Sequence, residues 1–387
     1  MTPPVPPAPD RRTFLAATGA GLLVSTAMPA NDPPLAPPDK QPPDLKLPEP
    51  PPKPAGWAVV GLGKLALEEV MPAFALCKRS KPVALVSGHP DKAKKVAAAY
   101  GLDPKNIYDY QGYDALKDNP AVDVVYVILP NSMHAEYTIR GHKAGKHVLC
   151  EKPMAATAAE CEQMIAAARA AKRKLMVAYR LRYEPFNRKA IELCRGGEVG
   201  ELRSITASNC QVVQAPNIRL SKELAGGPVE DIGIYCLNAC RYLTGEEPVE
   251  VTAVAHRPAD DPRFREVPAS VAFTLRFPSG VVATCDCSFD AAESRRYRAQ
   301  GAGGFVQMDP AFPYRGLRLT VHKGGKGCEL KLEEVNHFAA EMDHFSECVL
   351  DGKEPRTPGE EGLADVRVIE AVAEAARTGK AVKIGRG

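Results

Sequence analysis

The sequence lacks an excess of charge of one sign, a membrane-length apolar run and the paired cysteines of a zinc site. Its 50 lysines and arginines against 47 aspartates and glutamates leave a net charge of +3. That balance argues against a basic face of the kind that neutralises nucleic-acid phosphates. The apolar run from Phe14 to Ala27 is about 14 residues long, and a membrane-spanning helix needs about 20. We therefore expect no nucleic-acid partner and no stable membrane anchoring.

The 11 cysteines do not form a recognisable metal or disulfide pattern. Cys285 and Cys287 share one face of a strand-like run, but no second pair follows at zinc spacing. His337 and the pair Glu341/His344 have helical spacing that could suggest a metal. No further ligand accompanies them, which favours an amphipathic helix. We predict neither a metal nor a structural disulfide.

The length and composition indicate a large folded protein with an unusual N-terminus. The 387 residues allow two or three domains, and 45% of them are apolar, enough for a substantial core. This excludes a mainly disordered chain and a disulfide-stapled miniprotein. Of the 36 prolines, 17 lie in the first 54 residues.

Residues 1–30 have the features of an export signal. Arg11-Arg12-Thr13-Phe14-Leu15 precedes the short apolar run, and small residues follow it. A positive start, a short apolar stretch and small residues describe a signal peptide, and the arginine pair resembles a twin-arginine signal. We expect a periplasmic protein that is exported already folded. Cleavage after Ala27 or after Ala30 fits equally well, and the alternative is a chance arginine pair before a short core helix.

Residues 31–54 form a proline-rich arm. With 11 prolines and almost no periodicity, the segment predicts an extended, semi-rigid chain of polyproline type. Composition favours a solvent-exposed tether. An arm that lies on a neighbouring subunit is the alternative.

A glycine fingerprint indicates a dinucleotide-binding domain over residues 55–178. The apolar strand Ala58-Val59-Val60 leads into Gly61-Leu62-Gly63-Lys64-Leu65-Ala66, and a helical run to Cys77 follows. This is G-x-G-x-x-A between strand and helix, where Gly61 permits the turn and Gly63 lets the backbone approach a pyrophosphate. We assign Gly61, Gly63, Lys64 and Leu65 to the cofactor. The alternative is a glycine loop without a nucleotide.

The end of the next strand favours NADP over NAD. An NAD site usually ends this strand with a carboxylate that bonds the ribose 2′-hydroxyl, whereas Val83–Val86 is followed by Ser87-Gly88-His89. No carboxylate there repels a 2′-phosphate, and Ser87, His89 and Lys92 can contact it. Asp91 better suits the first turn of the following helix.

Further alternation of strands and helices predicts a doubly wound parallel sheet of the Rossmann type. The apolar strand Val122–Leu129, the strand His147–Cys150 and the strand Lys174–Ala178 complete it. Ligands gather at the carboxyl ends of such strands. We therefore expect the cofactor beside Leu129, Pro130, Asn131 and His134 after one strand, and beside Glu151 and Lys152 after the next.

The glycine fingerprint followed about 90 residues later by Glu151-Lys152-Pro153 resembles the Gfo/Idh/MocA oxidoreductases, the family of glucose–fructose oxidoreductase, inositol dehydrogenase and related sugar dehydrogenases. The resemblance covers roughly residues 55–385 and extends to the N-terminal signal and arm. It is most specific toward glucose–fructose oxidoreductase. The similar segments are GLGKLAL, LVSGHPDKAK, ILPNSMHAE, GKHVLCEKPMA, ELAGG, DIGIY, GEEPVEV and TPGEEG.

The resemblance implies where the chemistry occurs. Most of the family is similar to D-x-x-x-H at the catalytic position, whereas this chain has Asp231-Ile232-Gly233-Ile234-Tyr235. By resemblance, Lys152 and Tyr235 flank the reacting carbon of a sugar, with Asp231 beside them. Further positions matched to the cofactor or the sugar are Tyr108, Arg180, Tyr183, Arg219 and Tyr314.

Three differences from the similar enzyme leave the identity of the sugar undetermined. Leu65 replaces a tyrosine of the similar enzyme, the segment Leu224–Pro228 is one glycine shorter, and the stretch Cys210–Arg219 is also shorter. These segments surround the expected sugar pocket.

Sugar oxidation requires a hydride acceptor and a proton acceptor. A tyrosine is a weak base at neutral pH, but a nearby ammonium favours the phenolate. Tyr235 is thus expected as acid/base and Lys152 as its electrostatic partner, with Asp231 one helical turn before Tyr235. By spacing alone, an exposed loop lysine and a core tyrosine are the simpler interpretation, and the resemblance reverses that preference.

Residues 179–387 predict an α+β domain with an open, mainly antiparallel sheet. The runs Leu202–Val213, Val249–His256, Ala269–Phe277, Val281–Phe289 and Leu317–Val321 alternate like half-buried strands. One face would hold the sugar and the other could pair with a second subunit, giving a homodimer or homotetramer. Helices near 336–351 and 360–378 follow, and we expect the last to return to the nucleotide domain. The fold class is α/β.

The sequence therefore predicts an exported sugar oxidoreductase with retained NADP. It would oxidise an aldose at C1 to the lactone and reduce a second, fructose-like sugar in ping-pong order. An NADP-dependent aldose dehydrogenase or ketose reductase with exchangeable cofactor is the first alternative. An NAD-dependent glycoside hydrolase of the same fold and a non-catalytic NADP-binding protein are weaker ones.

Overall fold

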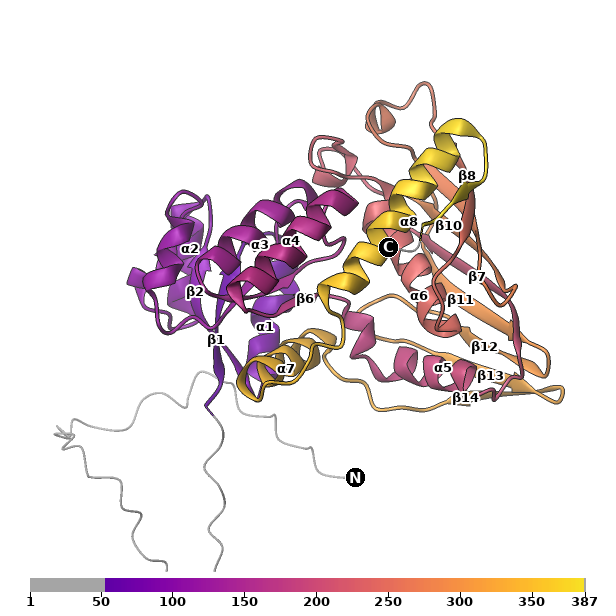
Figure 1. Cartoon of the computed structure of the whole chain (residues 1–387), viewed down its shortest axis with the longest axis horizontal. Coiled ribbons are helices and arrows are strands. Elements are labelled where there is room, and N and C mark those ends of the chain that lie inside the picture. Colours follow the sequence, from indigo (N-terminus) through magenta and orange to yellow (C-terminus); the bar gives the residue numbers. More distant parts are fainter. Residues whose placement is uncertain (1–52, 386–387) are drawn as a thin grey trace, which may run out of the picture. The chain divides into compact units, whose positions relative to one another are not determined.

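The computed structural model describes residues 53–385 (Figure 1). The predicted signal over residues 1–30 and all but the last two residues of the predicted arm lie outside the described residues. Within residues 53–385, no helix is both long enough and apolar enough to cross a membrane.

The first half of the described chain forms a six-stranded parallel sheet in the order β3-β2-β1-β4-β5-β6. The reversal of strand order between β1 and β4 makes this the doubly wound Rossmann sheet that the alternation of strands and helices predicted. The strands are β1 (Ala55–Val60), β2 (Ser80–Val86), β3 (Ile107–Tyr108), β4 (Val124–Val127), β5 (His147–Cys150) and β6 (Leu175–Val177).

Helices cover both faces of this sheet. The helical stretch after the glycine fingerprint begins with a π-helical turn, η2 (Ala66–Val70), and continues through α1 (Met71–Ala73) and the 3₁₀ turn η3 (Phe74–Leu76). The other helices of this half are α2 (Pro90–Ala99), α3 (His134–Lys143) and α4 (Ala158–Ala171), with 3₁₀ turns η4 (Pro104–Asn106), η5 (Gly112–Asp118) and η6 (Asn131–Met133). A capping box of Thr157 and Glu160 begins α4.

The second half contains a nine-stranded sheet in the order β14-β13-β12-β11-β7-β10-β9-β8-β15. Only β7 and β10 pair in parallel within it, so the predicted mainly antiparallel sheet is confirmed. The strands are β7 (Leu202–Cys210), β8 (Glu250–His256), β9 (Ser270–Arg276), β10 (Val282–Ser288), β11 (Ser294–Gly301), β12 (Gly304–Met308), β13 (Leu319–Lys323), β14 (Lys326–Leu330) and β15 (Val382–Lys383).

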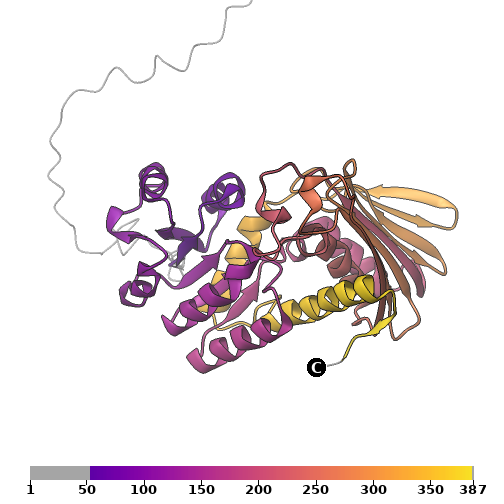
Figure 2. The same cartoon turned by 90° about the horizontal axis from the view of Figure 1, so that it is seen from above.

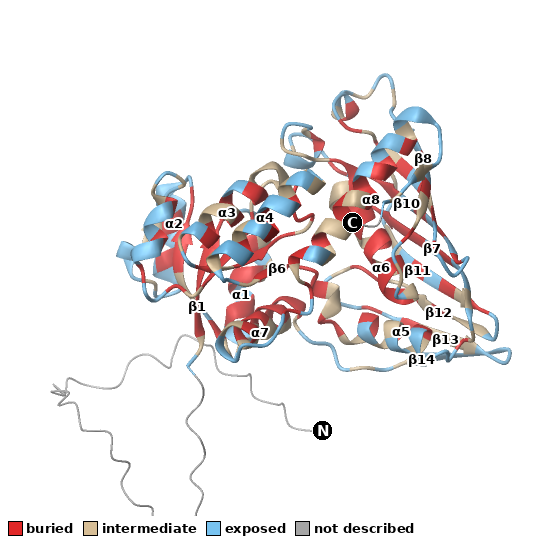
Figure 3. Cartoon of the chain, in the orientation of Figure 1, coloured by how far each residue is buried: buried red, intermediate tan, exposed pale blue. Residues whose placement is uncertain are grey.

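Helices lie on one face of the nine-stranded sheet (Figure 2). They are α5 (Pro185–Arg195), α6 (Ile234–Thr244) and α8 (Gly359–Thr378), with shorter turns η7 (Arg180–Arg182), η8 (Ile218–Leu220), η9 (Val229–Gly233) and η10 (Pro262–Phe264). The strands alternate buried and exposed residues, as β9 does, and Figure 3 colours this sheet by burial. One face of the sheet therefore packs against these helices, and the other face remains open.

The C-terminal helices return to the nucleotide half. On α7 (His337–Leu350), Ser346 Oγ accepts a hydrogen bond of 3.0 Å from the buried Trp57 Nε1 of β1. On α8, Glu360 pairs with Arg169 of α4 at 2.8 Å. The expectation for the last helix is confirmed, and α7 adds a second tie that sequence reasoning did not predict.

Candidate active site

The glycine fingerprint forms a cradle at the carboxyl end of β1. Gly61 has φ of +92°, and a Cβ there would lie 2.2 Å from the carbonyl oxygen of Ile128. A side chain would therefore push β1 away from the end of β4. At Gly63 a Cβ would meet open space, and η2 begins three residues later. This loop before a helix N-terminus fits the pyrophosphate of a dinucleotide.

The end of β2 supplies polar groups without a carboxylate. Ser87 is buried, its Oγ accepts from the backbone N–H of His89 at 3.1 Å, and its own N–H donates to the Tyr108 carbonyl at 3.0 Å. Lys92 Nζ lies 3.4 Å from the Leu62 carbonyl, directly below the glycine loop. Lys64 and His89 are exposed beside it. Ser87 and Lys92 thus both lie near the carboxyl ends of β1 and β2, where a 2′-phosphate would bind.

His134 connects the two cofactor loops rather than facing an open surface. It is completely buried, with Nε2 2.9 Å from the Leu129 carbonyl and Nδ1 2.8 Å from the Pro153 carbonyl. Burial lowers the pKa of this imidazole. His134 therefore positions the loops that follow β4 and β5.

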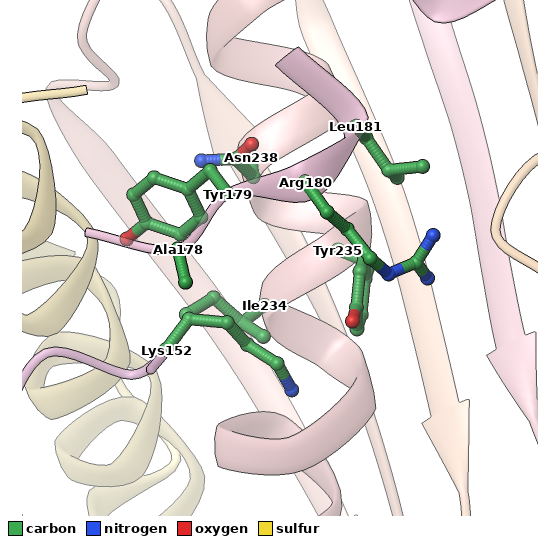
Figure 4. A pocket seen from close by; sticks show the side chains of 8 residues that line it. All are labelled: Lys152, Ala178, Tyr179, Arg180, Leu181, Ile234, Tyr235 and Asn238. Atoms are coloured by element: carbon green, nitrogen blue, oxygen red, sulfur yellow. The ribbon is translucent and has the colours of Figure 1, made fainter. Parts of the chain in front are cut away.

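Lys152, Asp231 and Tyr235 meet at one place, although they come from different elements. Lys152 Nζ donates to the backbone carbonyl of Asp231 at 2.6 Å and lies 3.8 Å from the Asp231 Oδ1. The same Nζ lies 4.7 Å from the centre of the Tyr235 ring. The π-helical turn η9 carries Asp231, and Tyr235 follows on the first turn of α6. Lys152 and Tyr235 line one pocket together (Figure 4).

Arg180 supplies a second cation beside Tyr235. Its guanidinium carbon lies 5.1 Å from the centre of the Tyr235 ring and 4.5 Å from that of Tyr314. Arg180 Nη1 donates to His337 Nδ1 at 3.1 Å, so His337 accepts as a neutral imidazole. Burial and the Arg180 charge together lower the pKa of His337 to about 3. Figure 4 shows the Arg180 and Lys152 side chains both reaching toward Tyr235.

The Asp231 carboxylate has further partners. Arg219 Nε donates to its Oδ2 at 2.6 Å, and Gln211 Nε2 lies 3.4 Å from the same oxygen. The Asp231 charge raises the pKa of Arg219. The carboxylate is thus held between Lys152 and Arg219, where its remaining lone pairs can accept from sugar hydroxyls.

Glu230, which precedes Asp231, should make stability depend on pH. Burial, with a smaller contribution from the Asp231 charge, raises the pKa of Glu230 to about 7. Because the folded-state pKa lies above the unfolded value, stability is lost as pH rises toward neutrality. Glu230→Gln removes this ionisation. Its gain in unfolding free energy over the wild type should grow to about 2 kcal/mol between about pH 5 and about pH 8. Denaturant unfolding measures it, the exposed Glu223→Gln is the control, and a gain independent of pH contradicts the assignment.

Neither Glu151 nor Tyr183 lines the pocket that Lys152 and Tyr235 share. Glu151 is buried and accepts from Tyr126 Oη at 2.7 Å. Tyr183 is only 4% exposed, with its hydroxyl 3.2 Å from Thr357 Oγ1 and its ring 5.1 Å from that of His344. The structure thus places Tyr183 in the core beside α7, which corrects its assignment to the sugar pocket. Apolar residues around a tyrosine in the sequence do not show whether its side chain packs in the core or lines a pocket.

The two α7 histidines that had suggested a metal make other contacts. His344 Nε2 accepts from the backbone N–H of Arg356 at 3.0 Å, and Glu341 is completely buried. Burial, with the nearby Glu151 charge, raises the pKa of Glu341 well above its usual range. Among residues 53–385, no group of three or more histidine, cysteine, aspartate or glutamate side chains could hold a metal ion.

Sequence reasoning missed three residues of the site. Gln211 contacts Asp231, Asn238 lines the pocket, and the Phe312 ring lies 5.8 Å from that of Tyr235. Asn238 stands three residues after Tyr235 on α6, so helical spacing could have revealed it. Phe312 lies outside the helices and strands, where no periodicity marks it. Gln211 lies in the alternating run predicted over Leu202–Val213, one residue past the end of β7, and that alternation does not reveal its contact with Asp231.

Comparison with known proteins agrees with this arrangement. Residues 55–179 match the oxidoreductase family with an NAD-binding Rossmann fold, and residues 187–307 match the C-terminal domain of the same family. The chain belongs to the Gfo/Idh/MocA family of oxidoreductases. The family prediction from Glu151-Lys152-Pro153 and the glycine fingerprint is therefore confirmed.

Similar members of the Gfo/Idh/MocA family act on sugars. A D-xylose 1-dehydrogenase [NADP(+)] of Haloarcula marismortui is 33% identical over 86% of this chain and 93% of its own. The structure of an aldose-aldose oxidoreductase from Caulobacter crescentus in complex with glycerol is 46% identical, with a TM-score of 0.84, over 86% of this chain and 100% of its own. A 3-ketoreductase from Actinomadura kijaniata in complex with NADP and TDP-benzene is 28% identical, with a TM-score of 0.75, over 84% and 98%. These relatives confirm the NADP prediction, and they include sugar enzymes other than glucose–fructose oxidoreductase.

A carboxylate at position 87 should shift the cofactor preference from NADP toward NAD. In Ser87→Asp, the added charge repels a 2′-phosphate and can accept from a ribose 2′-hydroxyl. We expect the affinity for NADP to fall at least roughly tenfold relative to NAD. Titration of cofactor-free protein with each dinucleotide measures the ratio. Ser87→Ala, which removes only the hydroxyl, should change it far less, and an unchanged ratio in Ser87→Asp would place the phosphate elsewhere.

Proposed function

We propose that this protein is an NADP-dependent aldose oxidoreductase that keeps its cofactor between two half-reactions. It oxidises an aldose at C1 to the lactone and then reduces a second sugar, a ketose such as fructose or another aldose, at the same site. The observation that carries the proposal is Tyr235 between the cations of Lys152 and Arg180, at the carboxyl edge of a dinucleotide sheet. The 46% identity to an aldose-aldose oxidoreductase supports it.

The side chains divide the chemistry between them. NADP, when bound, takes up the hydride from C1 and returns it in the second half-reaction. Tyr235 Oη accepts the C1 hydroxyl proton during oxidation and donates a proton to the carbonyl oxygen during reduction. The cations of Lys152 and Arg180 lie beside the Tyr235 ring, where they offset the negative charge that develops on the reacting oxygens as the proton moves. Asp231, held by Arg219, is positioned to orient hydroxyls on the rest of the sugar.

The test uses desalted protein with no cofactor added. The near-ultraviolet absorbance of reduced nicotinamide should rise on addition of an aldose and fall again on addition of a second sugar. Parallel double-reciprocal plots with both sugars varied should accompany this cycle. Protein that purifies without cofactor and turns over only with added NADP would contradict cofactor retention.

A conventional NADP-dependent aldose dehydrogenase is the second candidate. The 33% identity to a D-xylose 1-dehydrogenase favours it. The same catalytic residues serve both candidates, so only exchange of cofactor between turnovers separates them.

We further propose periplasmic export through the twin-arginine signal and assembly into a homodimer or homotetramer. The arginine pair at Arg11-Arg12 supports the first proposal. The open face of the nine-stranded sheet, where Val254 and Val282 are exposed, offers a surface for the second. Fractionation of cells expressing the wild type or Arg11→Lys/Arg12→Lys tests export. Light scattering of the purified protein tests assembly.

A further inference from the structure

One segment of the sugar-binding half crosses to the nucleotide half. This segment, residues 217–227, links β7 to α6, and we refer to it as the strap. Its Ala225 carbonyl accepts from Asn131 Nδ2 at 2.8 Å, and its Leu224 carbonyl accepts from the backbone N–H of Ser132 at 3.3 Å. Asn131 and Ser132 belong to η6, in the segment that follows β4, at the edge where a dinucleotide binds.

The strap is held in shape by its own backbone. The Gly226 N–H donates to the Ser221 carbonyl at 2.9 Å, and the Ala225 N–H donates to the Lys222 carbonyl at 3.0 Å. A Cβ on Gly226 would lie 2.4 Å from the Arg219 carbonyl oxygen. Gly226 therefore allows the two arms of the strap, one through Arg219 and the other through Ala225 and Gly226, to touch. This contact directs the Ala225 carbonyl toward Asn131.

The other arm of the strap reaches the catalytic group. Arg219 belongs to it and pairs with Asp231 at 2.6 Å. The strap thus makes contact at both ends of the crevice: at Asp231 beside Lys152, and at Asn131 after β4. A dinucleotide that extends from the Gly61 cradle to Lys152 would bind at the same carboxyl edge of the sheet as these two contacts.

We propose that the strap and Asn131 form a clasp that slows release of the dinucleotide. This inference rests on the proposed function, because a slow release is what lets one cofactor serve both half-reactions. Before the dinucleotide can leave, the strap must break its two hydrogen bonds from the nucleotide half and the Arg219–Asp231 pair. The contacts with Asn131 and Ser132 determine the lifetime of the bound cofactor, whereas Arg219 of the strap also holds Asp231 for the sugar.

The test measures how fast bound NADPH leaves the protein. Gly226→Ala forces the arms of the strap apart without adding a group that could contact the cofactor. Asn131→Ala removes the donor from the other side. We expect each variant to release NADPH roughly tenfold faster or more, as expected for loss of one or two hydrogen bonds. Nicotinamide fluorescence after dilution into excess NADP follows the release, and Lys222→Ala, an exposed side chain of the strap, is the control.

The double variant separates the clasp from a direct contact. If Asn131 and Gly226 act through the same contact, Gly226→Ala/Asn131→Ala should release NADPH about as fast as the faster single variant. Additive effects would mean that Asn131 acts independently of the strap, which overturns the clasp. Release at the wild-type rate in both single variants also overturns it.

Failure of the clasp and failure of the proposed function give different results. If the wild type retains NADPH and the variants retain it equally well, the proposed function is supported and the clasp is contradicted. If the wild type exchanges NADPH between turnovers and the variants release it tenfold faster, cofactor retention is contradicted and the clasp is supported. If Gly226→Ala does not fold, Asn131→Asp, which opposes a carboxylate to the Ala225 carbonyl, should show the same acceleration.

Discussion

Tyr235→Phe should lower kcat for aldose oxidation by roughly 10²- to 10⁴-fold, because it removes the group that exchanges the proton. The ring would remain between Lys152 and Arg180, which lie 4.7 and 5.1 Å from its centre. The cofactor contacts after β1, β2 and β4 do not involve this hydroxyl. Steady-state rates with sugars and titration of NADP together measure the effect, which should appear in kcat while NADP affinity is unchanged.

Tyr183→Phe is the matched control for this variant. Tyr183 is buried beside His344 and bonds Thr357, so loss of its hydroxyl should cost about 1 kcal/mol of stability and leave kcat near the wild-type value. Equal losses of activity in the two variants would mean that Tyr235 is only structural. Near-normal activity in Tyr235→Phe would remove the tyrosine from the proton step.

Lys152→Met should have the second large effect, a fall of roughly 10²- to 10³-fold in kcat/KM. Methionine keeps the unbranched shape of lysine but removes the ammonium. The variant therefore loses both the charge beside Tyr235 and the donor to the Asp231 carbonyl at 2.6 Å. Steady-state kinetics with an aldose measures it, and most of the loss should fall on kcat.

Two further variants define what Lys152 contributes. Lys152→Arg keeps the charge but not the compact geometry, so it should recover only part of the activity. Lys174→Met removes a lysine whose partner is Glu354, 2.8 Å away, and should leave kcat/KM unchanged. Full activity in Lys152→Met would contradict a role for this ammonium.

Sequence reasoning predicted the buried strands well, because continuous apolar runs and their spacing carry the signal. The strand at His147–Cys150 has the predicted bounds. The strand β11 was missed because arginines at positions 295, 296 and 298 hide its alternation. The two-residue strand β3 is too short to give any periodicity. Strands that depend on pairing more than on burial are therefore the ones that the sequence conceals.

The candidate site divides in the same way. Lys152 and Tyr235 stand in motifs, so they could be named from the sequence. Their meeting could not be derived from spacing, since Lys152 follows β5 and Tyr235 lies on the first turn of α6. The contact between Asn131 and Ala225 joins residues 94 positions apart, and neither residue type suggests it. Long-range contacts of backbone carbonyls leave no trace in composition or periodicity.

The most direct test of cofactor retention follows one hydrogen atom. Desalted protein, with no dinucleotide added, is supplied with an aldose deuterated at C1 and with an unlabelled second sugar. If one retained cofactor carries the hydride from the first sugar to the second, the reduced sugar carries deuterium at its former carbonyl carbon. The amount of this deuterated product should exceed the amount of protein many times over. Reduced sugar without deuterium, or no product until NADP is added, would contradict a single site that keeps its cofactor between two sugars.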